Sequence, residues 1–518
     1  MALRKDCASR LCQTVVCLNG CPIDFRGNHS SSAMRAKLFH KDRCSRSRSM
    51  KIAFLPLLLA ASGLAAPPQR TSLNECLRSA GPSVYQCSFQ APPGAVDKHV
   101  RIVADALLSG AKVWLNGELI GEHKSGIAPF EFDLTPALKT GATNTLAMRL
   151  ENPGILRDVY LLTTGRVFPV KQSVVAAPQR VAVSVTVRNT LDNTSGVQVS
   201  FTVSIGGKTV GNGSANAAIP PNLTQSIDAV IALRSEDVHL WDPDHPNLYR
   251  LRTAITKNAE AAEGNYETEI ESAFGIRTVE IVGSQFLLNH EPLRLGGAHP
   301  AGEPSEEDLR SMKEAGMIFQ LLDHTVSTAV LDWADRNGML LIEKSEMRDR
   351  DANHPSVIAW AGATPDDSIA TKRMDPTRPV TMIDFVVATP PSLMATSPVR
   401  ALFLDAISEP DGIAELLRDT PRIFGAAAAN SRDSRWAEQF RAARIHDVFQ
   451  SNGNTFIEVR NSAGFPSQIL RDYKVRVGPH TRNLPILKLG ESATLEFEHV
   501  NPYRVEVRQP TGFVVDSR

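Results

Sequence analysis

The sequence lacks an excess of charge of either sign. Its 518 residues contain 56 basic and 56 acidic side chains. A nucleic-acid-binding protein of this size usually carries a basic excess, and a disordered chain holds fewer apolar residues than the 42% present here. Both classes are therefore disfavoured. The length is sufficient for three or four hydrophobic cores, as in a soluble multidomain protein.

Motifs for several kinds of chemistry are also missing. The sequence holds no G-x-S-x-G element and no Cys/His arrangement, so lipolytic and proteolytic reactions lack a nucleophile motif. Four cysteines near the N-terminus are spaced as in a metal knuckle, but no other feature of that segment looks folded. They are Cys7, Cys12, Cys17 and Cys21. We therefore expect no metal and no cofactor.

The first 49 residues differ in composition from the rest of the chain. They hold ten Lys and Arg against three Asp and Glu, and five of the seven cysteines. Met50-Lys51 then precedes an apolar run from Ala53 to Ala61 and the small residues before Pro67. This order is typical of a secretory signal peptide, and the run is too short to span a bilayer. We expect translation to start at Met50 and the processed protein to be periplasmic or extracellular, without membrane attachment.

Two cysteines, Cys76 and Cys87, remain after the expected cleavage. An oxidising compartment allows them to form a disulfide, but the sequence leaves their pairing open.

The pattern along the processed chain changes twice. Two stretches of about 100 residues each show the alternation of apolar and polar residues that is typical of β-strands, for example from Val181 to Val187. From Phe286 the pattern changes to short apolar runs separated by segments with helical periodicity. After Asn454 the sequence pattern is again typical of β-strands. The expected divisions are 1–49 (upstream extension), 50–66 (signal peptide), 67–169 and 170–277 (β-sandwiches), 278–428 (strand and helix alternation) and 429–518 (linker helix and β-sandwich).

Several motifs carry a resemblance to a known family. Val113 to Glu118 and Gly154 to Leu161 resemble the N-terminal sugar-binding domain of glycoside hydrolase family 2, which includes β-galactosidases, β-glucuronidases and β-mannosidases. Trp241-Asp242-Pro243 and Phe274 to Arg277 resemble its immunoglobulin-like domain and barrel entry, and Asn353 to Trp360 resembles a barrel motif. The resemblance implies a jelly roll, an immunoglobulin-like sandwich, a TIM-type barrel and a C-terminal β-sandwich.

Retaining hydrolysis needs two carboxyl groups about 5–5.5 Å apart at barrel strand ends, one as proton donor and one as nucleophile. In the family, the motif ending at Trp360 continues to the acid/base Glu. Here Pro365 stands at that position. Asp366 and Asp367 follow directly, but a shorter side chain displaced by one residue would miss the leaving oxygen. The sequence therefore lacks an identifiable acid/base.

Two residues are alternatives for the nucleophile. Asp405 lies at the end of the apolar run from Ala401, whereas Glu409 matches the family in residue type. A turn that caps the helix starting at Ile413 explains Glu409 equally well.

Sugar contacts are implied by the resemblance at four positions, and each also has an ordinary structural explanation. They are Asp158, His324, Glu343 and Trp360. An Arg that precedes the family's His is replaced by Leu321, which removes a set of hydrogen-bond donors.

The interval from Phe286 to Ala428 is shorter than the about 250 residues of a (β/α)₈ barrel. We therefore expect a reduced barrel. The preferred interpretation is an exported family 2 homologue, related to enzymes that hydrolyse β-linked sugars, with lost or weakened catalysis. The alternative is a non-catalytic carbohydrate-binding or scaffold protein. Carbohydrate is the expected partner, nucleic acid is not, and self-association through the β domains stays open.

Overall fold

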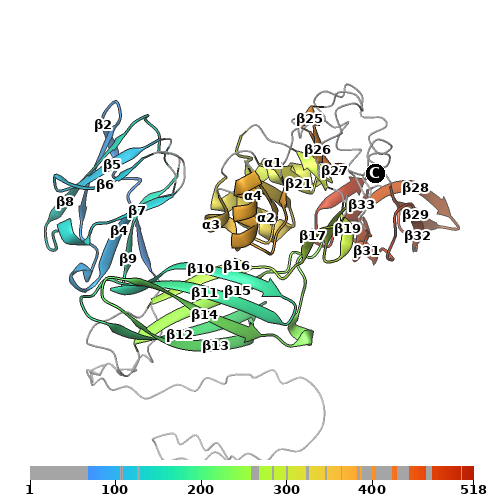
Figure 1. Ribbon diagram of the computed structural model, residues 1–518. Helices are drawn as coiled ribbons and strands as arrows, with labels where there is room; N and C mark the ends of the chain where they lie inside the picture. Colours follow the sequence, from blue (N-terminus) through green and yellow to red (C-terminus); the bar gives the residue numbers. More distant parts are fainter. Residues whose placement is uncertain are drawn as a thin grey trace, which may run out of the picture. The chain divides into compact units, whose positions relative to one another are not determined.

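The structure is a computed structural model, and the part of the chain that it describes begins at residue 68. The described residues are 68–105, 107, 109–124, 129–155, 157–257, 268–282, 285–293, 295–298, 302–314, 316–322, 326–344, 347–362, 365–381, 386–387, 400–403, 423–428, 443–462, 469–502 and 504–518. Figure 1 labels many of the elements named below.

The first domain is a β-sandwich of two antiparallel sheets. One sheet has the order β1 (Gln69–Ser72), β9 (Val159–Thr164), β4 (His99–Ala104) and β7 (Phe130–Asp133). The other has the order β2 (Arg78–Gly81), β3 (Val84–Gln90), β8 (Thr143–Leu150), β5 (Ala111–Leu115) and β6 (Glu118–His123). Strict alternation in β8, with Leu146 and Met148 buried, places one face of the sheet on the core. The 3₁₀ turns η1 (Ala95–Asp97) and η2 (Thr135–Ala137) connect strands.

Cys76 and Cys87 form a disulfide in this domain, with their Cα atoms 5.1 Å apart. The bond joins the segment after β1 to the buried side of β3. The pairing that the sequence left open is therefore present in the structure.

The second domain is an immunoglobulin-like sandwich. Its first sheet has the order β10 (Val167–Ala177), β11 (Arg180–Asn189) and β14 (Thr224–Ala232). Its second has the order β13 (Lys208–Ile219), β12 (Ser195–Ile205), β15 (Tyr249–Lys257) and β16 (Thr268–Phe274). The alternating valines from Val181 to Val187 lie in β11 and are buried, as the period of two predicts. The turn η3 (Ser235–Asp237) follows β14.

A small antiparallel sheet leads into the parallel barrel. It consists of β17 (Val279–Val282), β18 (Gln285–Leu288) and β19 (Glu291–Leu293). The parallel strands that follow are β20 (Leu295–Ala298), β21 (Phe319–Leu321), β22 (Leu340–Lys344), β23 (Val357–Ala361), β24 (Val380–Thr381), β25 (Val386–Val387), β26 (Arg400–Phe403) and β27 (Ile423–Ala428). The first strand pairs with both the second and the eighth, in the manner of a (β/α)₈ barrel.

The barrel is reduced in two respects. The strands β24 and β25 stand at the two ends of the sheet order, and only four residues separate them in sequence, too few for a parallel crossover. In the described part of the barrel the connecting helices are also short. They are α1 (Glu306–Glu314), α2 (Thr328–Asn337), α3 (Arg348–Asp351) and α4 (Pro365–Met374). All eight strands are nevertheless present, which is more than the sequence suggested.

The last domain is the C-terminal sandwich. One sheet has the order β28 (Ala443–Ser451), β29 (Asn454–Asn461) and β32 (Ser492–Phe497). The other has the order β31 (His480–Asn483), β30 (Lys474–Val477), β33 (Val505–Arg508) and β34 (Val514–Ser517). Val459, Val475 and Val507 are fully buried between them.

The N-terminal ends of the barrel strands are held by the immunoglobulin-like domain. The indole nitrogen of Trp241 donates to the carbonyl of Asp335 at 2.9 Å, and the buried Lys313 donates to the carbonyls of Pro243 and Gly338 at 3.0 and 2.8 Å. These bonds satisfy a buried ammonium with backbone oxygens. Among the described residues, no helix has the length and apolar character needed to cross a bilayer.

Candidate functional site

The C-terminal ends of the barrel strands are where an active site of this fold is expected. Glu343 lies at this end of β22, and Trp360 is its register partner on the neighbouring strand β23. Both side chains are buried, at 2% and 0% exposure. The structure therefore brings two of the predicted sugar contacts together, but inside the barrel.

Glu343 is buried in an environment that disfavours its charged form. Burial, the negative charge of Asp351 and a hydrogen bond to Asp351 raise its pKa well above the ordinary value, and the charges of Arg350 and Arg378 only partly oppose them. Its Oε2 atom has no hydrogen-bond partner in the described part of the chain. Asp351 is fully buried and accepts two bonds from the guanidinium of Arg350, at 2.5 and 2.7 Å. Glu343 and Asp351 thus form a pair of carboxyl groups, and the guanidinium of Arg350 is the cation bound to Asp351.

Trp360 acts as a packing group in this arrangement. Its indole nitrogen donates to the carboxylate of Asp375 at 2.8 Å, and Arg378 lies over the ring, with its guanidinium carbon 5.3 Å from the ring centroid. Burial acts to raise the pKa of Asp375, but the charge of Arg378 and hydrogen bonds from Thr377 and Trp360 lower it to about 2. The indole N–H of Trp360 is thus already hydrogen-bonded to the carboxylate of Asp375 within the barrel.

The expected acid/base position is the first residue of α4, the helix that follows β23. The strand ends at Ala361, and Pro365 begins the helix. Asp366 and Asp367 occupy the first turn of α4, where carboxylates interact favourably with the helix dipole. They therefore belong to a helix. The Oγ1 atom of Thr371 donates to Asp367 at 3.5 Å.

Asp158 lies on the first sandwich, directly before β9. Its carboxylate accepts bonds from Arg70 at 3.0 Å and from Asn74 at 2.6 Å, and its side chain is 59% exposed. The neighbouring Arg157 forms an ion pair with Glu303, which follows β20 at the C-terminal end of the barrel strands. This ion pair ties the segment that carries Asp158 to the barrel end expected to bind sugar.

Three other predicted site residues lie outside the described residues. They are His324 and the two alternative nucleophiles Asp405 and Glu409. The run that was assigned to the nucleophile strand does form a strand, β26, and it is the seventh of the parallel set.

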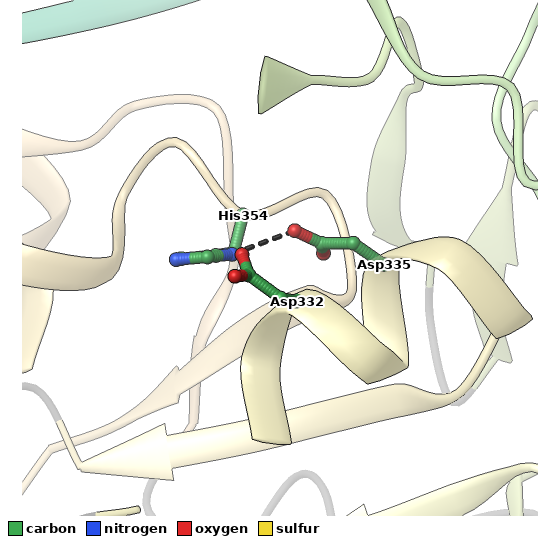
Figure 2. A group of neighbouring side chains, drawn as sticks. All are labelled: Asp332, Asp335 and His354. Atoms are coloured by element: carbon green, nitrogen blue, oxygen red, sulfur yellow. Dashed lines mark hydrogen bonds and ion pairs between the residues drawn. The ribbon is translucent and has the colours of Figure 1, made fainter. Parts of the chain in front are cut away.

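One titratable cluster was not singled out from the sequence. His354 donates from Nδ1 to Asp335 at 2.6 Å, and the second oxygen of Asp335 accepts the backbone N–H of Ser356 at 3.0 Å. Asp332, one turn earlier on α2, offers a third oxygen within 4.8 Å (Figure 2). The cluster lies where α2 ends and β23 begins, at the face of the barrel linked to stability rather than catalysis. The family motif from Asn353 to Trp360, which contains His354, was the sequence signal for this cluster.

The order of a jelly-roll sandwich, an immunoglobulin-like sandwich and a parallel barrel defines a glycosidase-type multidomain protein. The family model described as "Glycosyl hydrolases family 2, sugar binding domain" matches residues 71–153, and that described as "Glycosyl hydrolases family 2" matches residues 166–277. The chain belongs to glycoside hydrolase family 2. The resemblance and the fold class inferred from the sequence are thereby confirmed.

Curated relatives are similar over part of their length. A β-galactosidase of Thermoanaerobacter pseudethanolicus is 27% identical over 334 residues, which cover 54% of this chain and 44% of the relative. A β-glucuronidase of Canis lupus familiaris is 24% identical over 366 residues, which cover 53% of this chain and 54% of the relative. The chain thus spans about half the length of these relatives.

Solved structures share the fold. A glycosyl hydrolase family 2 member from Bacteroides cellulosilyticus has a TM-score of 0.59 at 16% identity, covering 86% of this chain and 79% of its own. A putative β-galactosidase from Bacteroides fragilis has a TM-score of 0.57 at 16% identity, covering 82% and 91%.

Proposed function

We propose that this chain is an exported carbohydrate-binding member of the family in which glycoside hydrolysis is lost or severely weakened. The observation that carries the proposal is the position of Pro365. The residue expected to deliver the proton is replaced by the first residue of helix α4. A glycosidic oxygen is a poor leaving group unless it is protonated as the bond breaks.

Three described carboxyl groups near this end of the barrel do not replace the missing acid. Glu343 and Asp351 form a pair, but they are 2% and 0% exposed, so neither meets a sugar bound in solvent-accessible space. Asp366 is exposed on the first turn of α4, with a side chain shorter than that of Glu. Glu343, Asp351 and Asp366 therefore do not supply the proton donor that hydrolysis requires.

Export is proposed from the Met50 signal pattern together with the disulfide. Disulfides form in secreted and periplasmic proteins and are rare in reducing cytosol. The bond between Cys76 and Cys87 therefore supports an oxidising compartment.

The test uses two leaving groups that differ in their need for a proton. The protein from Ala66 onward is incubated with 4-nitrophenyl and 2,4-dinitrophenyl β-galactosides, β-glucuronides and β-mannosides, and glycan binding is measured in parallel. A dinitrophenolate leaves without protonation, so slow turnover of that substrate alone would indicate a missing acid beside a working nucleophile. Binding without turnover of either substrate would indicate the non-catalytic alternative.

The proposal fails if 4-nitrophenyl substrates are hydrolysed at rates usual for enzymes and Glu409→Gln or Asp405→Asn abolishes that activity. Such a result would mean that a proton donor exists elsewhere in the chain.

A further inference from the structure

The C-terminal sandwich carries basic side chains on the outer face of one of its sheets. In β30 the side chains of Val475 and Val477 are buried in the core. Because side chains alternate along a strand, Lys474 and Arg476 point to the opposite face, where both are exposed.

The neighbouring strand β33 adds two arginines to this face. Arg508 is the register partner of Lys474, although like charges at paired positions repel, and Glu506 is the register partner of Arg476. Arg504 lies directly before β33, forms an ion pair with Glu506, and has a side chain that is 72% exposed. The stretch from Arg504 to Arg508 spans about 13 Å of extended backbone. The basic row, as we call it below, consists of Lys474, Arg476, Arg504 and Arg508.

Glu506 is the carboxylate within the basic row. One of its oxygens accepts two bonds from the guanidinium of Arg508, at 2.6 and 2.9 Å, and the other lies 2.9 Å from Nε of Arg504. Burial acts to raise the pKa of Glu506, but the hydrogen bond and charge of Arg508 and the charge of Arg504 lower it below the ordinary value. Glu506 is therefore ionised at neutral pH. A single carboxylate cannot occupy all the N–H donors of two guanidinium groups.

The strands and loops beside the basic row do not neutralise it. The adjacent strand β31 places Thr481 and Asn483 opposite the outward residues of β30. Asp472, which precedes β30, is already bound to His245 at 2.9 Å. The basic row thus has a net positive charge, although the chain after residue 49 is net acidic. A local concentration of one charge on a protein surface attracts ligands of the opposite charge.

We propose that the basic row binds an anionic polysaccharide through carboxylate or sulfate groups along the polymer. Guanidinium groups form paired hydrogen bonds with such oxyanions. Cations distributed over about 13 Å of β-strand suit a linear polymer with repeated charges. The basic row lies outside the residues that either family model matches. The proposal rests on the proposed export of the chain, but it does not depend on the barrel.

The composition of this face favours a polysaccharide over two other kinds of polyanion. A peripheral membrane site combines cations with apolar side chains that enter the lipid. Sites for single-stranded nucleic acid combine cations with aromatic rings on which the bases stack. In β30, β31 and β33, which the structure describes completely, the outward positions hold neither an aromatic nor a large apolar residue.

Biolayer interferometry of the protein from Ala66 onward tests the proposal with immobilised polygalacturonate, dextran sulfate, neutral dextran, double-stranded DNA and phosphatidylglycerol vesicles. At least one of the two anionic polysaccharides should bind more tightly than dextran, DNA and the vesicles. This binding should weaken as the salt concentration rises, because exposed charges are screened. The double variant Lys474→Ala, Arg476→Ala should weaken it about tenfold or more, since both side chains are exposed donors. Circular dichroism establishes that the variant is folded.

A matched control separates the basic row from the total charge of the protein. The double variant Arg250→Ala, Arg310→Ala removes the same charge from exposed positions on β15 and α1 and should leave the affinity unchanged. Hydrolysis of the aryl glycosides concerns the barrel alone, so failure of the proposed function would be distinguishable from failure of this proposal. The proposal is overturned if neither anionic polysaccharide binds, if dextran, DNA or the vesicles bind more tightly than both, if salt has no effect, or if the Lys474 and Arg476 variant retains the affinity of the control.

Discussion

His245 should stabilise the contact between the immunoglobulin-like domain and the C-terminal sandwich in a pH-dependent way. Its Nδ1 atom lies 3.2 Å from an Asp242 oxygen, and its Nε2 atom lies 2.9 Å from an Asp472 oxygen. A neutral imidazole has one N–H donor, whereas an imidazolium has two. Both contacts are therefore hydrogen bonds only when the ring is charged.

The magnitude follows from the pKa of the ring. The hydrogen bond to Asp242 is the largest influence, and with the charge of Asp242 and the bond to Asp472 it raises the pKa of His245 from 6.5 to about 9, against the opposing effect of burial. A shift of this size corresponds to at most about 3 kcal/mol, and solvent screening of a side chain that is 33% exposed reduces it to about 1–2 kcal/mol. Since the folded pKa is the higher one, the contribution is complete below pH 6.5 and is lost as pH rises through about 9.

The assay compares urea unfolding of the wild type and His245→Gln between pH 6 and 10. The wild type should be more stable by about 1–2 kcal/mol at pH 6, and the difference should vanish by pH 10. The comparison removes the background of Lys313, whose pKa burial lowers to about 8, because both variants keep it. Burial raises the pKa of Asp244 to about 6, and the charge of His245 acts on Asp244, so a change in the titration of Asp244 is part of the measured difference. NMR titration of the His245 ring gives the pKa directly. A midpoint at or below 7, or a stability difference that does not change with pH, would refute the reasoning.

Three further predictions concern the disulfide, a glycine and the buried acid. Joint replacement of Cys76 and Cys87 by Ser should cost about 3 kcal/mol of unfolding free energy, because the bond closes a short loop in the unfolded chain; urea curves that match those of the oxidised wild type would contradict this. Gly338→Ala should lower the melting temperature more than Gly206→Ala. Both glycines have positive φ, but an added Cβ would overlap a backbone carbonyl at Gly338 and would meet no atom at Gly206. Equal shifts of the melting temperature in calorimetry would argue against this prediction. Glu343→Gln should gain stability over the wild type as pH rises, because the raised pKa of Glu343 makes ionisation in the fold costly; parallel stability profiles against pH would exclude this.

The regular parts of the fold were predictable from local pattern. The alternating residues from Val181 to Val187 specify β11, and the apolar run that begins at Met339 specifies β22, since burial of one or both faces of a strand leaves a direct signal. The strands β24 and β25 have only two residues each, which is too short for a periodicity to be read. The order of the eight strands could therefore be recognised only from the pairing of the strands in the structure.

The partners of the candidate site residues were less predictable. Asp158 is bound by Arg70 and Asn74, which are 88 and 84 residues away in sequence. Burial and, after it, the charge of Asp351 raise the pKa of Glu343, and Asp351 lies on the one-turn helix α3, which gave no periodic signal of its own. Residue type identified these carboxylates as candidates, but only tertiary contacts determine which of them is charged, exposed or already occupied.

The absence of the acid/base residue results from the local backbone path as well as from the replacement of one side chain. Proline is well suited to the first turn of a helix, because its missing N–H would have no partner there. At Gly362, just after β23, a Cβ would overlap the Oγ atom of Ser368 on α4, so the chain passes from strand to helix with no space for a side chain at this point. The residues that permit this short connection thus place a helix start where a loop carrying the proton donor is expected. A Glu introduced at 365 would lie on the first turn of α4, so the acid would require a rebuilt loop as well as a carboxyl group.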